Sequence, residues 1–149
     1  MSANTSDHVY EAIIRSDSDS VWKALTDSTE TQKYFFHTRI ESDWKPGSSY
    51  RGYGPDGSLS SDGEIVEIEA GSHFKTTFKP VWLGDNGQAA STVSWNVESL
   101  GPATLVKLTH SGIDDETFDA GQLGPGWVYV VSSLKSLLET SEPLPDLFG

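Results

Sequence analysis

The sequence predicts an α+β fold, with one strand, two short helices, a run of antiparallel strands and a long C-terminal helix in that order. Three observations lead to this prediction: strand-like alternation across residues 39–111, turn dipeptides that interrupt it repeatedly, and one long apolar helix stripe near the end. The length of 149 residues fits one domain, residues 1–149.

The first elements are expected to be a strand and two short helices. HVYEAIIR, residues 8–15, is rich in β-branched and aromatic residues and runs into SDSDS, whose side chains can cap a helix. VWKALTD, residues 21–27, then carries apolar residues at helical spacing. Asp27 or Ser28 can cap a second short helix that ends in the aromatic triplet at 34–36.

The central segment has the pattern of an antiparallel sheet. TVSWNV, residues 92–97, alternates apolar with polar side chains, as a sheet with one solvated face requires. TLVKLTH at 104–110 and HFKTTFK at 73–79 alternate in the same way. Glycine, proline, asparagine and aspartate gather between these runs, so we expect tight turns there.

The last element is expected to be a long helix. It can begin at Gly124-Pro125-Gly126, because proline is tolerated in a first turn, and it ends before Pro143. About 16 residues at about 1.5 Å each give a rod of about 24 Å, enough to cross a sheet. One stripe of this helix carries its large apolar side chains: Trp127, Val131, Leu134 and Leu138.

Three glycines have the spacing of a dinucleotide-binding motif, but their context excludes it. Gly52, Gly54 and Gly57 match GxGxxG, which requires a helix directly after it. Pro55-Asp56-Gly57 has instead the chemistry of a hairpin turn, and a strand-like run follows. Gly52 and Gly54 are expected to permit a bulge or the close packing of another element, and no cofactor is expected.

The composition narrows the possible partners and chemistry. With 22 acidic and 10 basic residues the net charge is -12, so nucleic acid and anionic membranes should be repelled. Cysteine is absent, and the four histidines lack metal-binding spacing, so no metal site is expected. No apolar run approaches the roughly 20 residues that cross a bilayer, which predicts a cytoplasmic protein without membrane insertion.

His110 is the one candidate for catalysis. Its strand places Val106 and Leu108 on the same inward face, so the imidazole could reach an interior cavity and act as a base near neutral pH. It could equally hold the loop that follows. Since no serine lies in a GxSxG turn and the acidic residues 114–116 are expected in a solvated loop, we assign no catalytic residue.

Four segments of the sequence resemble one known family. They are VWKALTDSTETQKYFF at 21–36, DWKPGSSYRGYGPDGSLSSDGEIVEIE at 43–69, LVKLTHSGID at 105–114 and GWVYVVSSLKSLLE at 126–139. In this order they resemble the START-like, helix-grip superfamily, abbreviated SRPBCC, in the branch related to the C-terminal domain of the activator of the heat-shock-protein-90 ATPase. The resemblance covers the chain from about residue 8 to 141, which is the expected core of the domain. The resemblance implies a curved antiparallel sheet that grips the C-terminal helix, with a cavity that in many relatives holds an apolar small molecule.

The expected function is therefore to bind a hydrophobic or aromatic small molecule, such as a lipid, a polyketide or a flavonoid-like compound. Relatives often carry a tryptophan pair where this chain has Phe35 and Phe36, and the turn at 80–90 is longer than usual and could add a flap. Of Tyr50 and Tyr53, which lie on opposite faces of one strand, Tyr50 is favoured to point inward. The residues expected to contact the ligand are Tyr50, Phe74, Phe78, Trp95, Val106, Leu108, His110, Trp127, Val131 and Leu134.

Two alternatives stay open at this stage. The first is a cyclase- or hydrolase-like enzyme that acts on the ligand, with His110 or Tyr50 as general acid or base; positioning alone can accelerate a reaction, so few catalytic residues are needed. The second, less favoured, is a chaperone ATPase co-activator, which only the family resemblance suggests.

Overall fold

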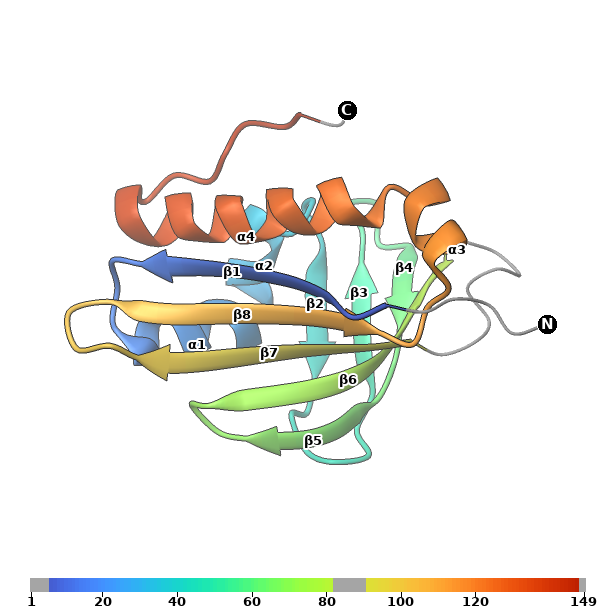
Figure 1. Cartoon of the computed structure of the whole chain (residues 1–149), viewed down its shortest axis with the longest axis horizontal. Coiled ribbons are helices and arrows are strands. Elements are labelled where there is room, and N and C mark those ends of the chain that lie inside the picture. Colours follow the sequence, from blue (N-terminus) through green and yellow to red (C-terminus); the bar gives the residue numbers. More distant parts are fainter. Residues whose placement is uncertain (1–5, 82–90, 148–149) are drawn as a thin grey trace.

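A curved antiparallel sheet wraps around one side of a long C-terminal helix (Figure 1). The structure is a computed structural model that describes residues 6–81 and 91–147. Its elements are, in order, β1 (His8–Ile14), α1 (Ser18–Thr26), α2 (Ser28–Tyr34), β2 (Arg39–Ser42), β3 (Tyr50–Tyr53), β4 (Leu59–Asp62), β5 (Ile65–Glu69), β6 (His73–Pro80), β7 (Ser91–Ser99), β8 (Thr104–Ser111), α3 (Asp115–Ala120) and α4 (Leu123–Thr140). This is the predicted α+β helix-grip fold, with two short helices after the first strand.

The sheet curls back on itself. Its strand order is β1-β8-β7-β6-β4-β3-β2, all pairs are antiparallel, and β5 pairs with β6 beside this path. As a result β2, β3 and β4 lie behind β1, β8 and β7 in Figure 1, and α4 runs along the top of the opening between these two halves. The turn from β4 to β5 needs Gly63, because a Cβ there would overlap the Thr77 carbonyl of β6.

Capping aspartates set the helix starts, as the sequence predicts. Asp17 accepts a hydrogen bond from the Ser20 amide at 2.7 Å and begins α1, and Asp27 accepts from the Thr29 amide at 2.8 Å and begins α2. The expectation of a solvated loop at 114–116 is wrong. Asp114 caps α3 through the Thr117 amide at 2.8 Å, and the acidic residues after it favour a helix N-terminus.

The core fills the space between α4 and the middle of the sheet. Trp22 lies at its edge, with its ring 5.8 Å from that of Phe74. The predicted alternation along β6, β7 and β8 is confirmed: apart from Leu105, the apolar residues of these strands point inward and are buried. Among the largest fully buried side chains are Ile14, Tyr34, Phe74, Trp95, Leu108, His110 and Leu134.

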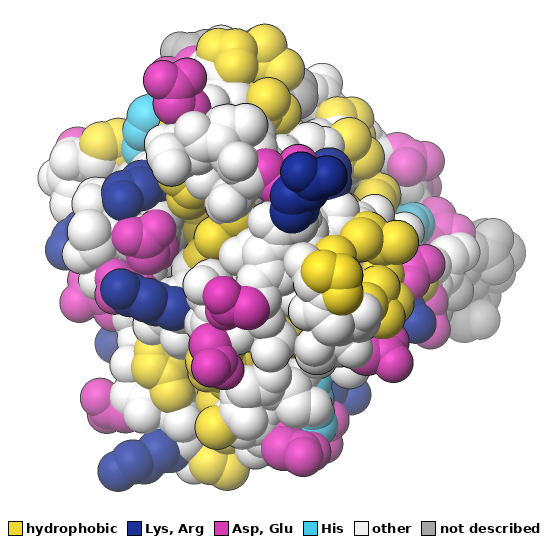
Figure 2. Space-filling view, turned by 90° about the vertical axis from the view of Figure 1, so that its left-hand side faces the viewer, with side chains coloured by type: hydrophobic (Ala, Val, Ile, Leu, Met, Phe, Trp, Pro, Cys, Tyr) yellow, Lys and Arg dark blue, Asp and Glu magenta, His cyan; other side chains and the backbone are white. Residues whose placement is uncertain are grey.

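The surface mixes charge types. On the end of the molecule drawn in Figure 2, acidic, basic and hydrophobic groups are interspersed, and no single charge type covers the face. Within residues 6–81 and 91–147, none of the helices has both the length and the hydropathy that crossing a bilayer demands.

Candidate functional site

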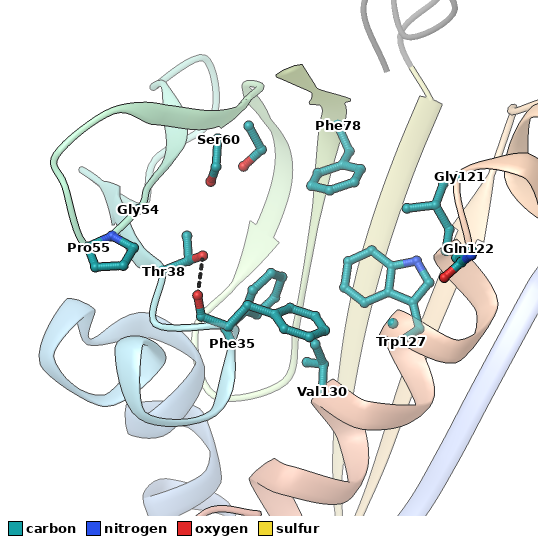
Figure 3. Close-up of a pocket in the computed structure, with 14 residues that line it drawn as sticks. Phe35, Thr38, Gly54, Pro55, Ser60, Phe78, Gly121, Gln122, Trp127 and Val130 are labelled. Carbon is teal, nitrogen blue, oxygen red and sulfur yellow. Dashed lines mark hydrogen bonds between the residues drawn. The ribbon is translucent and has the colours of Figure 1, made fainter. Parts of the chain in front are cut away.

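A pocket of about 420 Å³ opens between the N-terminal half of α4 and the end of the sheet formed by β2, β3 and β4 (Figure 3). This volume lies within the range of about 300–1,000 Å³ that small-molecule sites occupy. Most of the lining is apolar, and the polar groups are few. The lining residues are Phe35, Phe36, Thr38, Gly54, Pro55, Ser60, Ser61, Phe78, Gly121, Gln122, Leu123, Gly126, Trp127 and Val130.

The turn after α2 supplies the first wall. Phe36 and His37 both have positive φ angles, 53° and 57°, which are unfavourable for side-chain-bearing residues. The turn is held by the Thr38 amide, which donates to the Phe35 carbonyl at 2.9 Å, and by the Thr38 hydroxyl, which donates to the Phe36 carbonyl at 3.3 Å. The Phe35 ring meets Trp127 edge to face at 5.7 Å. Backbone strain is therefore stored where the aromatic wall is built.

The N-terminal part of α4 supplies the opposite wall. Trp127 and Val130 face the pocket in Figure 3, one helical turn apart. Between them and the turn lies Gly126, where an added Cβ would be 3.9 Å from the Phe36 ring, an ordinary contact distance. Glycine inside a helix is unfavourable by about 0.5–1 kcal/mol relative to alanine. At this position the missing side chain leaves room for about one methyl group between the helix and the Phe36 ring.

The β3–β4 hairpin closes the third side through Gly54, Pro55 and two serines. The pairing shifts register between Gly52 and Tyr53, which is the bulge that the glycine pattern predicts. A Cβ at Gly52 would lie 2.7 Å from Ser61 Oγ and 2.8 Å from Thr38 Cγ2, so only glycine lets β3 approach these side chains.

His110 lies behind the pocket and connects two of its walls. Trp127 Nε1–H donates to His110 Nδ1 at 3.0 Å, which places the ring proton on Nε2. Nε2–H then donates to Ser91 Oγ at 2.8 Å, and the Ser91 hydroxyl donates to the Phe78 carbonyl at 2.9 Å. Every donor in this chain is used. Since the Phe78 and Trp127 rings are themselves 5.5 Å apart, the chain holds two lining side chains in fixed relation.

This arrangement is the reverse of a hydrolytic serine–histidine pair. A histidine that activates serine must accept the hydroxyl proton on Nε2, and a carboxylate at Nδ1 supports that role. Here Nδ1 faces the Trp127 donor, and Nε2 carries the proton. Burial, with repulsion from His8 added, lowers the pKa of His110 from 6.5 to about 4. His110 is therefore neutral at pH 7 and acts on the pocket as a positioning residue.

The structure separates the sequence-predicted contact residues into two groups. Phe78 and Trp127 line the pocket, and His110 supports both of them from behind. The rest are buried in the packed core and do not line this pocket: Tyr50, Phe74, Trp95, Val106, Leu108, Val131 and Leu134. Tyr50 does point inward, but it packs against Trp44 and Phe74 at 5.7 and 5.9 Å, and burial raises its pKa. The lining instead contains Phe36, Gly126 and residues of the β3–β4 hairpin.

Apart from Phe78 and Trp127, most of the residues that line the pocket were not predicted from the sequence. One signal was present: the departure of Phe35 and Phe36 from the tryptophan pair of relatives marked this stretch as a wall. The expected flap at 80–90 falls on residues 82–90, which lie outside the described residues. In the part of the chain that the structure describes, no group of three or more histidine, aspartate or glutamate side chains is placed to hold a metal ion.

Comparison with known proteins places the chain in a family. A family model described as "Activator of Hsp90 ATPase homolog 1-like protein" matches residues 15–139. The chain therefore belongs to this family, within the START-like SRPBCC superfamily, whose fold is in general that of a ligand-binding domain. No curated protein shows significant sequence similarity to the chain.

Solved structures share the fold at low identity. The protein MLL2253 from Mesorhizobium loti is similar with a TM-score of 0.76 at 19% identity, over 89% of this chain and 96% of that one. The Aha1 dimer from Colwellia psychrerythraea is similar with a TM-score of 0.73 at 18% identity, over 91% of this chain and 97% of that one. DynU16, a putative protein in the dynemicin biosynthetic locus, gives 0.76 at 24% identity, over 92% of this chain and 48% of that one.

Proposed function

We propose that the protein binds a hydrophobic or aromatic small molecule in the pocket between α4 and the β3–β4 hairpin. One observation carries the proposal: a hollow of about 420 Å³ lies beside Gly126 of α4, between aromatic walls formed by Phe35, Phe78 and Trp127. Aromatic walls with a few polar groups suit an organic guest of the lipid, polyketide or flavonoid-like kind. The buried hydrogen-bond chain behind Trp127 supports the proposal, because a wall fixed in advance need not be ordered on binding.

A pair of substitutions at one position tests this function. Gly126→Ala adds a Cβ at ordinary contact distance from Phe36 and should leave room for a ligand, whereas Gly126→Leu extends into the pocket. Thermal unfolding is measured with a panel of long-chain alcohols and planar aromatic compounds. A ligand present at 100 times its dissociation constant should stabilise the wild type by about 2.7 kcal/mol.

The expected result is stabilisation of the wild type and the alanine variant and none of the leucine variant, with all three folded. Two outcomes would overturn the proposal. One is a panel in which no compound stabilises the wild type. The other is equal stabilisation of the leucine and alanine variants, because the ligand would then bind elsewhere.

Binding is preferred to a cyclase- or hydrolase-like activity because of how the two candidate groups are placed. Both ring nitrogens of His110 are engaged by Trp127 and Ser91, and Tyr50 packs in the core away from the pocket lining. A reaction in this pocket would have to depend on positioning of the substrate by the walls. Unchanged turnover of an identified substrate by the His110→Gln variant would exclude histidine chemistry.

The family description raises a second candidate, co-activation of a heat-shock-protein-90 ATPase. Its test is an ATPase assay with the purified chaperone: stimulation by this protein would support it, and an unchanged rate at saturating protein would contradict it. A cytoplasmic location, which the sequence predicts, is compatible with both candidates.

A further inference from the structure

A second hollow lies next to the apolar pocket. Its volume is about 520 Å³, and it shares Gly54 and Pro55 of the β3–β4 hairpin with the first. The same turn therefore forms part of the wall of both. The second hollow is lined by Gln32, Lys33, His37, Arg39, Gly54, Pro55 and Pro143.

The charged side chains that line this second hollow are basic, although the molecule as a whole is acidic. The chain carries a net charge of -12, yet the charged side chains that line the hollow are Lys33 and Arg39, and the one titratable neighbour among them is His37. None of the described residues that line it is an aspartate or a glutamate. Lys33 and Arg39 are therefore the groups of this hollow that can pair with an anionic group of a ligand.

Each of these groups already has an acidic neighbour outside the lining. Lys33 Nζ lies 3.1 Å from Glu30, Arg39 Nη1 lies 3.4 Å from Glu41, and His37 Nε2 lies 2.9 Å from Asp146. All three pairs are at the surface, where an ion pair contributes about 0–1 kcal/mol. A ligand anion can therefore share or replace these partners at little cost in stability.

We propose that the ligand of the apolar pocket is an amphipathic organic acid, with its apolar body against Phe36 and Trp127 and its carboxylate toward Lys33 and Arg39. This inference rests on the proposed function and adds the chemical class of the ligand. At about 30 Å³ for each water-sized group, a pocket of 420 Å³ holds a body of about 14 non-hydrogen atoms. A single saturated or aromatic acid of that size fills the apolar pocket and ends at the shared hairpin.

The test compares two probes that differ in their head group, decanoate and 1-decanol, by calorimetric titration at low ionic strength. The basic variant is Lys33→Gln/Arg39→Gln. Its matched control is Arg51→Gln/Lys107→Gln, which removes the same charge from exposed strand positions that line neither hollow. Folding of each variant is checked by thermal unfolding.

We expect wild type to bind decanoate more tightly than 1-decanol. The basic variant should lose about two- to tenfold in decanoate affinity, since two surface charges are removed, and should bind 1-decanol unchanged. The control should retain the decanoate preference, and added salt should reduce that preference in the wild type by screening.

The inference would be overturned if wild type bound the two probes with equal affinity, or if the basic variant and its control lost equal affinity for decanoate. Either result would leave the proposed function standing. If neither these probes nor any compound of the panel bound at all, the proposed function itself would fail. Tighter decanoate binding by Glu41→Gln would add support, because this change releases Arg39 from its acidic neighbour.

Discussion

Replacing His110 with glutamine should remove a defined part of the acid sensitivity of the fold. His110 is fully buried, and its pKa is lowered from 6.5 to about 4 by burial and, second, by His8. Between these two pH values the unfolded chain holds a proton that the native protein does not. The native protein is therefore destabilised as the pH falls through this window, and its stability recovers as the pH rises.

The size of the effect follows from the shift. At 1.36 kcal/mol for each pKa unit, a change from 6.5 to about 4 corresponds to about 3 kcal/mol, lost between pH 7 and pH 4. His110→Gln cannot titrate and does not carry this loss. The aspartates and glutamates titrate in both proteins, so the difference between the two stabilities isolates the histidine.

Urea unfolding of both proteins at pH 4, 5, 6 and 7 measures this difference. The variant is expected to be less stable at pH 7, because Trp127 and Ser91 lose their hydrogen-bond partner. The difference between the two free energies of unfolding should then narrow by about 3 kcal/mol toward pH 4. If the free energies of unfolding of the two proteins change in parallel from pH 4 to 6.5, His110 is not a neutral, buried group. The assignment of its ring proton to Nε2 would then also be refuted.

Two further substitutions test the geometry around the pocket. Gly52→Ala should destabilise the fold by about 1–3 kcal/mol, because its Cβ would lie 2.7 Å from Ser61 Oγ; an unchanged melting temperature would contradict that close approach. Tyr129→Phe removes a hydroxyl that donates to the Leu144 and Pro145 carbonyls at 3.2 and 3.1 Å. It should increase proteolytic cleavage of the C-terminal segment with a stability loss of about 1 kcal/mol, and unaltered cleavage would count against this attachment.

Local sequence patterns were sufficient to predict the order of the main elements, although not helix α3. Alternation along β7 identifies the inward face that carries Trp95, and the aspartate caps identify the starts of α1 and α2. These signals act within a few residues, where the period of a strand or a helix turn decides which side chains share a face. The prediction of a loop at 114–116 was wrong because a capping aspartate was treated as a surface charge, although capping had been predicted for the run SDSDS and for Asp27 or Ser28.

The position of the pocket could not be predicted in this way. Trp127 and Leu134 share one stripe of α4, two turns apart, yet Trp127 lines the pocket and Leu134 is fully buried beneath the sheet. Periodicity treats them alike, and what separates them is that Trp127 borders the hollow beside β3 and β4 whereas Leu134 packs in the core. The partners of His110 are equally non-local, since Ser91 and Trp127 come from β7 and α4. Such contacts depend on tertiary packing, which no window of sequence contains.

The most direct measurement of the central claim is an NMR titration of the isotope-labelled protein with 1-decanol. The account predicts that the Trp127 indole N–H and the Gly126 amide shift in a saturable manner, because both belong to the pocket lining. The indole signals of Trp22 and Trp95, in the packed core, should stay in place. Saturable shifts at Trp95 with none at Trp127, or no saturable shift at either, would contradict the claim that this pocket receives an apolar guest.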